Sequence, residues 1–238
     1  MKLLFFKTSK TKENIMYQFS ALIPLRIGSK GIHKKNIKKI GGKPLCEWVI
    51  QAACSAKHIG NVYVSTESSE ISEIIDNLNL DVTVISRPPE LATDIASTES
   101  VMLHSLNYIS SENLVTIQAT SPLLSESDLD NACEQFIDQK NDSVLSAVRM
   151  KRFLWSDDGK PLNYMPESRP RRQDFDGTFI ENGAFYISNC GLLAETKSRL
   201  HGNIGIFEMS EDTFIEIDTP EDWSMVEKIM NERLSHAA

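Results

Sequence analysis

The stretch SALIPLRIGSKGIHKKN, residues 20–36, contains the two features that organise the rest of the chain. Its first six residues, 20–25, form a short apolar run that stops at a glycine-containing loop, which is typical of a buried strand. Pro24 indicates that the strand ends there, because proline cannot donate a hydrogen bond to a sheet. Similar apolar runs recur along the chain, and segments with helical periodicity lie between them.

Strand-like runs and amphipathic helices alternate from this point to the end of the chain. Further strands are expected at 61–66, 81–85, 113–119, 143–148, 183–188 and 214–218. Helices are expected at 43–57, 68–78, 97–109, 125–138 and 219–234. Strands that alternate with helices of this length predict an α/β fold, with a mostly parallel, doubly wound (Rossmann-like) sheet that helices cover on both faces.

The loop after the first strand concentrates positive charge. The chain has a formal net charge of −8, yet this loop carries Arg26, Lys30 and Lys35 beside Gly28 and Gly31. Glycines let backbone N–H groups approach an anion, and the cations add to that attraction. The loop matches neither the P-loop nor the dinucleotide-binding motif. It suits a phosphate cradle, with a solvated basic loop as the alternative.

The composition indicates a globular chain with local rather than general positive charge. With 238 residues, of which 41% are apolar, the chain is long enough for one large domain with a sizeable core. Its negative charge argues against a nucleic-acid or membrane partner, which needs a broad basic surface. No apolar run approaches the roughly 18 residues of a membrane span. The four cysteines have no metal-ligand spacing, so we expect reduced thiols and a cytoplasmic protein.

Two segments stand outside the alternating pattern. Residues 1–16 are polar overall and carry no motif, so we expect a flexible leader before a domain at 17–238, with Met16 as an alternative start. Residues 149–181 are rich in Arg, Pro, Asp and Gly and have no clean period. A connection of that length is typical of a functional loop or of one that reaches a partner.

Two carboxylates near the end of the chain form a second candidate site. If FIEID at 214–218 is a strand, Glu216 and Asp218 point to the same face of it. Like charges at that spacing repel unless a cation lies between them, and Mg²⁺ takes oxygen ligands beside phosphates. Solvated acids on an edge strand remain the alternative.

Two further groups of polar residues suit ligand binding. SRPRRQ at 168–173 holds three arginines, and arginine can bind a carboxylate through two parallel hydrogen bonds. A basic loop that pairs with the acidic surface is the alternative. Gln118, Thr120 and Ser121 follow a predicted strand at the edge of the sheet where ligands of such folds bind, although the hydroxyls also suit helix capping. The five histidines are scattered, which argues against histidine-based catalysis.

Five motifs, in order, give the chain a resemblance to one family. They are RIGSKGIHKKN (26–36), VSTESSEI (64–71), RPPELATDIAST (87–98), QATSPLL (118–124), and RRQDFDGTFIENGAFYI (171–187) with IEID (215–218). From about residue 19 to residue 230 the chain resembles the acylneuraminate cytidylyltransferases, or CMP-sialic acid synthetases. The resemblance implies a nucleotidyltransferase sheet and the transfer of CMP from CTP to the anomeric hydroxyl of a nonulosonic acid, with release of pyrophosphate.

The resemblance also implies roles for individual residues. The catalytic residues would be Arg26, Lys35 and Asp218. The nucleotide would be held by Gly28, Ser29, Lys30, Asn36, Arg87, Thr98 and Asn182. The sugar acid would be held by Gln118, Arg172, Gln173 and Tyr186. A Mg²⁺ ion would be held by Glu216 and Asp218. The family's counterpart of residues 149–181 contributes to a dimer, so the resemblance implies a homodimer.

The sequence departs from the family pattern at several positions. Glu216 replaces the usual Asp and Leu124 the usual Arg, so we expect a changed metal geometry and the loss of a phosphate or sugar contact. Glu67 replaces an Asp, and His33 and Ala119 each replace a Pro. Two alternatives therefore stay open. One is activation of a related acid, such as legionaminate, a deaminated nonulosonate or an octulosonate, and the other is a weakly active protein that binds CTP or a CMP-sugar.

Overall fold

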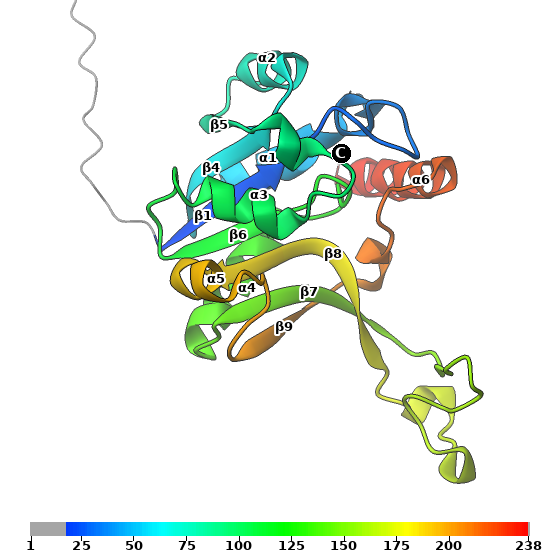
Figure 1. The fold of residues 1–238 in the computed structure, drawn as a ribbon. Coiled ribbons are helices and arrows are strands. Elements are labelled where there is room, and N and C mark those ends of the chain that lie inside the picture. Colours follow the sequence, from blue (N-terminus) through cyan, green and yellow to red (C-terminus); the bar gives the residue numbers. More distant parts are fainter. Residues whose placement is uncertain (1–17, 238) are drawn as a thin grey trace, which may run out of the picture.

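The computed structural model describes residues 18–237 and is built around one large sheet (Figure 1). The predicted leader at 1–16 lies outside these residues. The strands are β1 (Phe19–Pro24), β2 (Lys39–Ile40), β3 (Lys43–Pro44), β4 (Ile59–Thr66), β5 (Val82–Ser86), β6 (Asn113–Ile117), β7 (Ser143–Met150), β8 (Thr178–Asn189) and β9 (Ile204–Met209). The α-helices are α1 (Leu45–Ser55), α2 (Ser69–Asn77), α3 (Thr98–Ser105), α4 (Glu126–Asp138), α5 (Cys190–Thr196) and α6 (Pro220–Ala237).

The large sheet has the strand order β5-β4-β1-β6-β8-β7-β9, while β2 and β3 form a small separate hairpin. Strands β5, β4, β1 and β6 pair in parallel, and so do β7 and β9. Among the described residues, β8 alone runs against its neighbours in this sheet, since it pairs antiparallel with both β6 and β7. The predicted α/β class with a mostly parallel sheet is confirmed.

The central strand β1 packs its two sides into different cores, as successive side chains of a strand point to opposite faces. Ala21 and Ile23 belong to the larger core, with residues from α1, α2 and α4. Leu22 faces the other way and packs with Met102 of α3 and Leu193 of α5. Helices therefore cover both faces of the sheet, as the doubly wound pattern predicted (Figure 1).

Several helices begin at side chains that satisfy their first free N–H groups. Ser68 accepts a hydrogen bond from the N–H of Ile71 at the start of α2. Thr219 and Asp222 cap α6 reciprocally, each side chain accepting a hydrogen bond from the other residue's backbone N–H, as in a capping box. No helix among residues 18–237 is long and apolar enough to cross a membrane.

The strand predicted at 214–218 is wrong. Residues Glu211–Phe214 form a 3-10 turn, and the following segment, 215–219, has no strand partner. Ile215 and Ile217 pack against a core cluster that includes Trp223 and Val226 of α6, so their alternation reflects packing on a helix rather than on a sheet. The last strand of the large sheet is instead β9, an edge strand whose half-exposed Ile204 and Ile206 gave little strand signal.

The long irregular segment forms an arm that projects from the body between β7 and β8 (Figure 1). We call residues 151–177 the arm, because β7 extends to Met150 and β8 begins at Thr178, within the predicted 149–181. The ring of Phe153 lies 4.6 Å from that of Tyr164 and 5.1 Å from that of Phe175. This small aromatic cluster leaves three large apolar side chains exposed by 52–65%: Trp155, Leu162 and Met165.

Candidate functional site

A polar cleft of about 370 Å³ opens at the carboxyl ends of β1, β5 and β6. This is the edge where ligands of open α/β sheets bind. The glycine loop after β1, residues 26–36, forms one wall, and residues 91–98 form another. Of the residues predicted from the sequence, the cleft is lined by Arg26, Gly28, Ser29, Lys35, Asn36, Arg87, Thr98, Gln118, Glu216 and Asp218.

The glycine loop lies against the 215–219 segment. A Cβ atom at Gly31 would overlap the backbone carbonyl oxygen of Asp218, so a larger residue cannot lie there without moving one of the two segments. A Cβ at Gly28 would meet nothing within 4 Å. The loop therefore has one glycine that packs against the protein and one that leaves open space in the cleft. The amide of Asn36 closes the loop by donating to the carbonyl oxygen of Arg26 at 2.9 Å.

Lys35 connects the same two segments through its ammonium group. Its Nζ donates to the carbonyl oxygen of Ile217 at 2.6 Å and to Asp218 Oδ1 at 2.8 Å. The side chain is only 12% exposed, so most of its length is buried and the charge faces the cleft. The sequence placed Lys35 and Asp218 in one site only through the resemblance, and the structure brings them into contact.

Carboxylates also pair with the other cations around the cleft. Arg26 Nη1 lies 2.6 Å from Asp94 Oδ1, and Lys30 Nζ lies 3.2 Å from Asp94 Oδ2. The hydrogen bonds from Arg26 and Lys30 hold the pKa of Asp94 below its usual value. Arg87 Nη2 lies 2.6 Å from Glu67 Oε2. Asp94 and Glu67 both lie inside the motifs of the family resemblance, but their pairing with these cations was not predicted from the sequence.

Glu216 and Asp218 line the cleft together, although the strand expected to align them is absent. The carboxylate of Glu216 lies over Gly183, where any Cβ atom would overlap Glu216 Oε1. Gly183 also has a φ of +64°, which favours glycine. Burial raises the pKa of Glu216, the charge of Asp218 raises it further, and Lys35 opposes both. The cleft therefore contains a partly buried carboxylate whose negative charge is unfavourable.

Five predicted site residues lie outside the lining of this cleft, and one of them is Lys30, which pairs with Asp94 as described above. Asn182 is buried, and its amide donates to Thr213 Oγ1 at 3.0 Å. The Tyr186 hydroxyl donates to Glu181 at 2.9 Å. Burial, and to a smaller extent this hydrogen bond, raises the pKa of Tyr186 to about 12. Arg172 and Gln173 are exposed residues of the arm.

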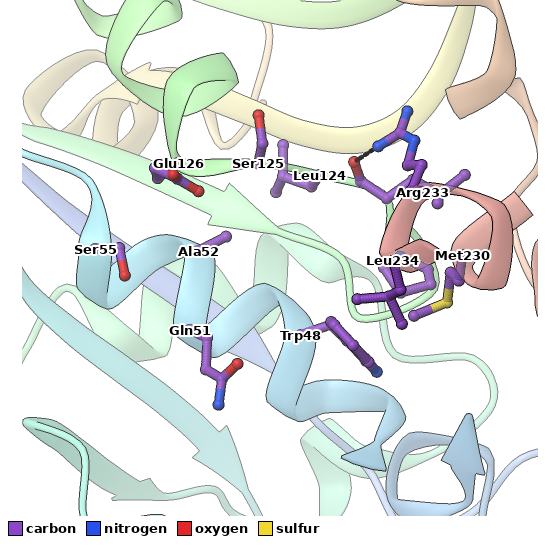
Figure 2. A pocket seen from close by; sticks show the side chains of 12 residues that line it. Trp48, Gln51, Ala52, Ser55, Leu124, Ser125, Glu126, Met230, Arg233 and Leu234 are labelled. Carbon is purple, nitrogen blue, oxygen red and sulfur yellow. Dashed lines mark hydrogen bonds between the residues drawn. The ribbon is translucent and has the colours of Figure 1, made fainter. Parts of the chain in front are cut away.

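A second hollow of about 320 Å³ lies between α1, the start of α4 and α6 (Figure 2). Figure 2 shows Trp48, Leu124 and Met230 around it, and Arg233 donates to the carbonyl oxygen of Leu123 at 2.9 Å. Its lining contains neither the glycine loop nor the carboxylate pair, so the polar cleft remains the candidate site. Leu124, which replaces the family's Arg, is buried in the wall of this hollow and does not line the cleft.

Comparison with known proteins identifies the family of this chain. A family model described as "Cytidylyltransferase" matches residues 20–233. The chain belongs to the cytidylyltransferase family. The match covers all the residues of the cleft, from the glycine loop to the 215–219 segment.

Two relatives and one solved structure illustrate the similarity of this cytidylyltransferase to others. N-acylneuraminate cytidylyltransferase A of Danio rerio is 37% identical over 217 residues, which cover 88% of this chain and 50% of the relative. Post-translational flagellin modification protein B of Campylobacter coli is 29% identical over 92% of this chain and 97% of its own length. The structure of CMP:2-keto-3-deoxy-manno-octonic acid synthetase complexed with CTP has a TM-score of 0.70 at 15% identity, covering 91% of this chain and 99% of that one.

The lengths differ between these relatives. This chain spans about half the length of the fish relatives that it matches, but nearly the whole length of the Campylobacter coli relative. At 15% identity, the likeness to the synthetase structure shows a shared fold and no more.

We predict that Glu216→Gln raises the melting temperature of the ligand-free protein at pH 7 in EDTA. The folded-state pKa of Glu216 lies above its unfolded value, so the ionised carboxylate destabilises the fold at neutral pH. The gain should disappear below a pH of about 4, where the glutamate is protonated in both states. Asp94→Asn is the control, because Arg26 and Lys30 favour the charge of Asp94 and its removal should bring no gain. An unchanged or lower melting temperature for Glu216→Gln at pH 7 would contradict the prediction.

Proposed function

We propose that this protein transfers CMP from CTP to the anomeric hydroxyl of a sialic-acid-like nonulosonic acid and releases pyrophosphate. The observation that supports it best is the cleft itself, where a glycine loop with cations faces a pair of carboxylates. The five motifs resemble those of acylneuraminate cytidylyltransferases, and the fish relatives carry that name. Because these relatives are about twice as long as the match, their activity is proposed for this chain rather than assigned to it.

The cations of the glycine loop suit the stabilisation of charge on the phosphates. In nucleotidyl transfer, negative charge on the α-phosphate oxygens and on the leaving pyrophosphate is stabilised by positioned donors. Lys35 and Arg26 line the cleft and are held there before any ligand binds, by Asp218 and Asp94 respectively. Phosphate oxygens would replace these carboxylates as partners. Because the two cationic side chains are already ordered in the ligand-free protein, their conformational entropy is lost on folding and not on binding.

The carboxylate pair suits a magnesium ion. Among residues 18–237 no group of three or more His, Cys, Asp or Glu side chains could hold a metal, so the ion would depend on Glu216, Asp218 and substrate phosphates. Mg²⁺ is commonly bound in this way, through one or two carboxylates plus phosphate oxygens. The unfavourable charge of Glu216 beside Asp218 fits a bound cation. When bound, the ion would offset charge on the departing pyrophosphate.

The residues predicted to bind the sugar acid do not all gather at the cleft of one chain. Gln118 lines the cleft, while Tyr186 lies outside its lining and Arg172 and Gln173 lie in the arm. A homodimer in which the arm reaches the neighbouring subunit would bring such residues to a second cleft. The exposed apolar side chains of the arm, 52–65% accessible in Trp155, Leu162 and Met165, support this proposal.

A related sugar acid remains a second candidate substrate. The relative from Campylobacter coli, matched over 97% of its length, is named for the modification of flagellin rather than for N-acylneuraminate. Legionaminate, a deaminated nonulosonate and an octulosonate share the carboxylate and anomeric hydroxyl that the reaction needs. The third hypothesis is a weakly active protein that binds CTP or a CMP-sugar.

Pyrophosphate release from CTP distinguishes these functions. We expect release that requires Mg²⁺ and N-acetylneuraminate or a related acid, and a panel of acids identifies the substrate by the highest kcat/KM. Binding of CTP without release, with every acid of the panel, would favour the weakly active protein. CTP used equally well without any sugar acid would contradict the proposed function.

We predict that Arg26→Ala and Lys35→Ala each lower kcat by roughly 100-fold, because each removes a donor to the reacting phosphates. The melting temperature of Arg26→Ala should stay close to the wild-type value, because its ion pair is exposed. Lys35→Ala also loses the contacts with Ile217 and Asp218, so its rate is measured at a temperature where that variant is folded. Lys34→Gln is the matched control, since the ammonium of Lys34 binds Glu70 and does not line the cleft. Wild-type rates in both alanine variants would rule out the phosphate cradle.

We predict a dimer by light scattering at micromolar concentration. Trp155→Glu together with Leu162→Glu should give monomers, because two charges would be buried in the interface. Tyr108→Glu changes an apolar residue that is 55% exposed outside the arm, so it should leave the dimer intact. A fully active wild-type monomer would contradict this proposal.

A further inference from the structure

Glu67 directly follows β4, and the two oxygens of its carboxylate bind the glycine loop and Arg87. Oε1 accepts a hydrogen bond from the backbone N–H of Ile27 at 2.9 Å. Oε2 accepts one from Arg87 Nη2 at 2.6 Å. The same Arg87 nitrogen donates to the carbonyl oxygen of Leu25 at 2.6 Å. The ion pair therefore binds the backbone immediately before and after Arg26.

The pair is largely excluded from water. The side chains of Arg87 and Glu67 are 3% and 16% exposed. Burial alone would raise the pKa of Glu67, but the hydrogen bonds from Arg87 and from the Ile27 amide outweigh it and leave the pKa below its usual value. The carboxylate is therefore ionised at neutral pH, and its contacts with the loop are charge-assisted.

Stability of the sheet does not account for this arrangement. The backbone already joins the strand ends, since Leu25 donates to Ser65 and Arg87 donates to Thr66, each at 2.9 Å. A buried ion pair is a weak source of net stability, and Arg87 Nε is buried without a hydrogen-bond partner. What the two side chains add is control over the path of the loop at Leu25 and Ile27.

We propose that Glu67 is a positioning residue, which acts with Arg87 to orient the glycine loop for the triphosphate of the nucleotide. Glu67 does not line the cleft, so it acts through the loop rather than by touching the ligand. Glu67 accepts a hydrogen bond from the N–H of Ile27, and Arg87 donates one to the carbonyl oxygen of Leu25. Together these bonds hold both peptide units that flank Arg26. This inference rests on the proposed function, since that function assigns the phosphates to this loop.

The length of the Glu67 side chain matters to this proposal. Glu67 reaches Arg87 and the loop at the same time, with one oxygen for each. Glu67→Asp keeps the charge but shortens the reach, so it should retain part of the function. Glu67→Gln keeps the length and loses the charge, so both contacts weaken and Arg87 is left with an uncompensated buried charge.

The test compares steady-state pyrophosphate release in the full-length wild type, Glu67→Gln and Glu67→Asp. We expect Glu67→Gln to raise KM for CTP about tenfold, the effect of losing one charge-assisted hydrogen bond. The KM for the sugar acid should not change, and Glu67→Asp should lie between the other two. Asp212→Asn is the matched control, because it removes an ion pair with Arg233 outside the cleft.

A binding measurement separates failure of this inference from failure of the proposed function. Calorimetry with inorganic triphosphate reports on the loop without any sugar acid or turnover, and we expect binding to the wild type that weakens about tenfold in Glu67→Gln. Suppose that the wild type releases no pyrophosphate from CTP, yet Glu67→Gln binds triphosphate about tenfold more weakly than the wild type. The proposed function then fails and the role of Glu67 stands. Equal triphosphate affinity and equal KM for CTP in wild type and Glu67→Gln would overturn it, as would a loss of the same size in Asp212→Asn.

Discussion

The ammonium group of Lys35 joins the two parts of the chain on which the cleft depends. It binds the carbonyl of Ile217 and the carboxylate of Asp218, which come from the far end of the domain sequence. The close approach of Gly31 to the backbone of Asp218 belongs to the same junction. Without this contact, the glycine loop and the carboxylate pair would be separate features of the surface. With it, an acidic chain presents cations and carboxylates to one small space.

The cations that line the cleft are paired with carboxylates in the ligand-free protein, and these pairs are of two kinds. Arg26 and Asp94 are exposed by 35% and 45%, and such pairs are weak enough to exchange for phosphate oxygens. Arg87 is buried and the side chain of Glu67 is 16% exposed, so breaking that pair leaves a charge largely away from water. The exposed pair can therefore respond to a ligand while the buried pair keeps the loop in place. A local basic site of this kind needs no positive charge on the whole protein.

The arm divides the predicted site residues into two groups. Those assigned to the phosphates lie on the body of the domain, where parallel strands end and the backbone is held by the sheet. Arg172 and Gln173 lie on a segment whose aromatic cluster is too small to cover its own apolar side chains. Under the proposed function, nucleotide activation would therefore depend on the body alone, whereas recognition of the acceptor would depend on the arm as well as on Gln118 and Tyr186 of the body.

The sequence by itself determined the α/β class, most of the strands and helices, and the glycine loop, because each depends on the spacing of neighbouring residues. It also identified ten residues that line the cleft, through the motifs that carry the family resemblance. Local spacing misled at 214–218, where alternation arises from packing against α6, and it gave little signal for β9 at the sheet edge. Only the tertiary structure decided that Glu67 and Asp94 bind the loop and its cations, that Asn182 is turned away to Thr213, and that Leu124 lies in another hollow. Periodicity records which way a side chain faces within its own element, whereas these contacts join elements far apart in the sequence and exist only once the sheet and its loops have packed.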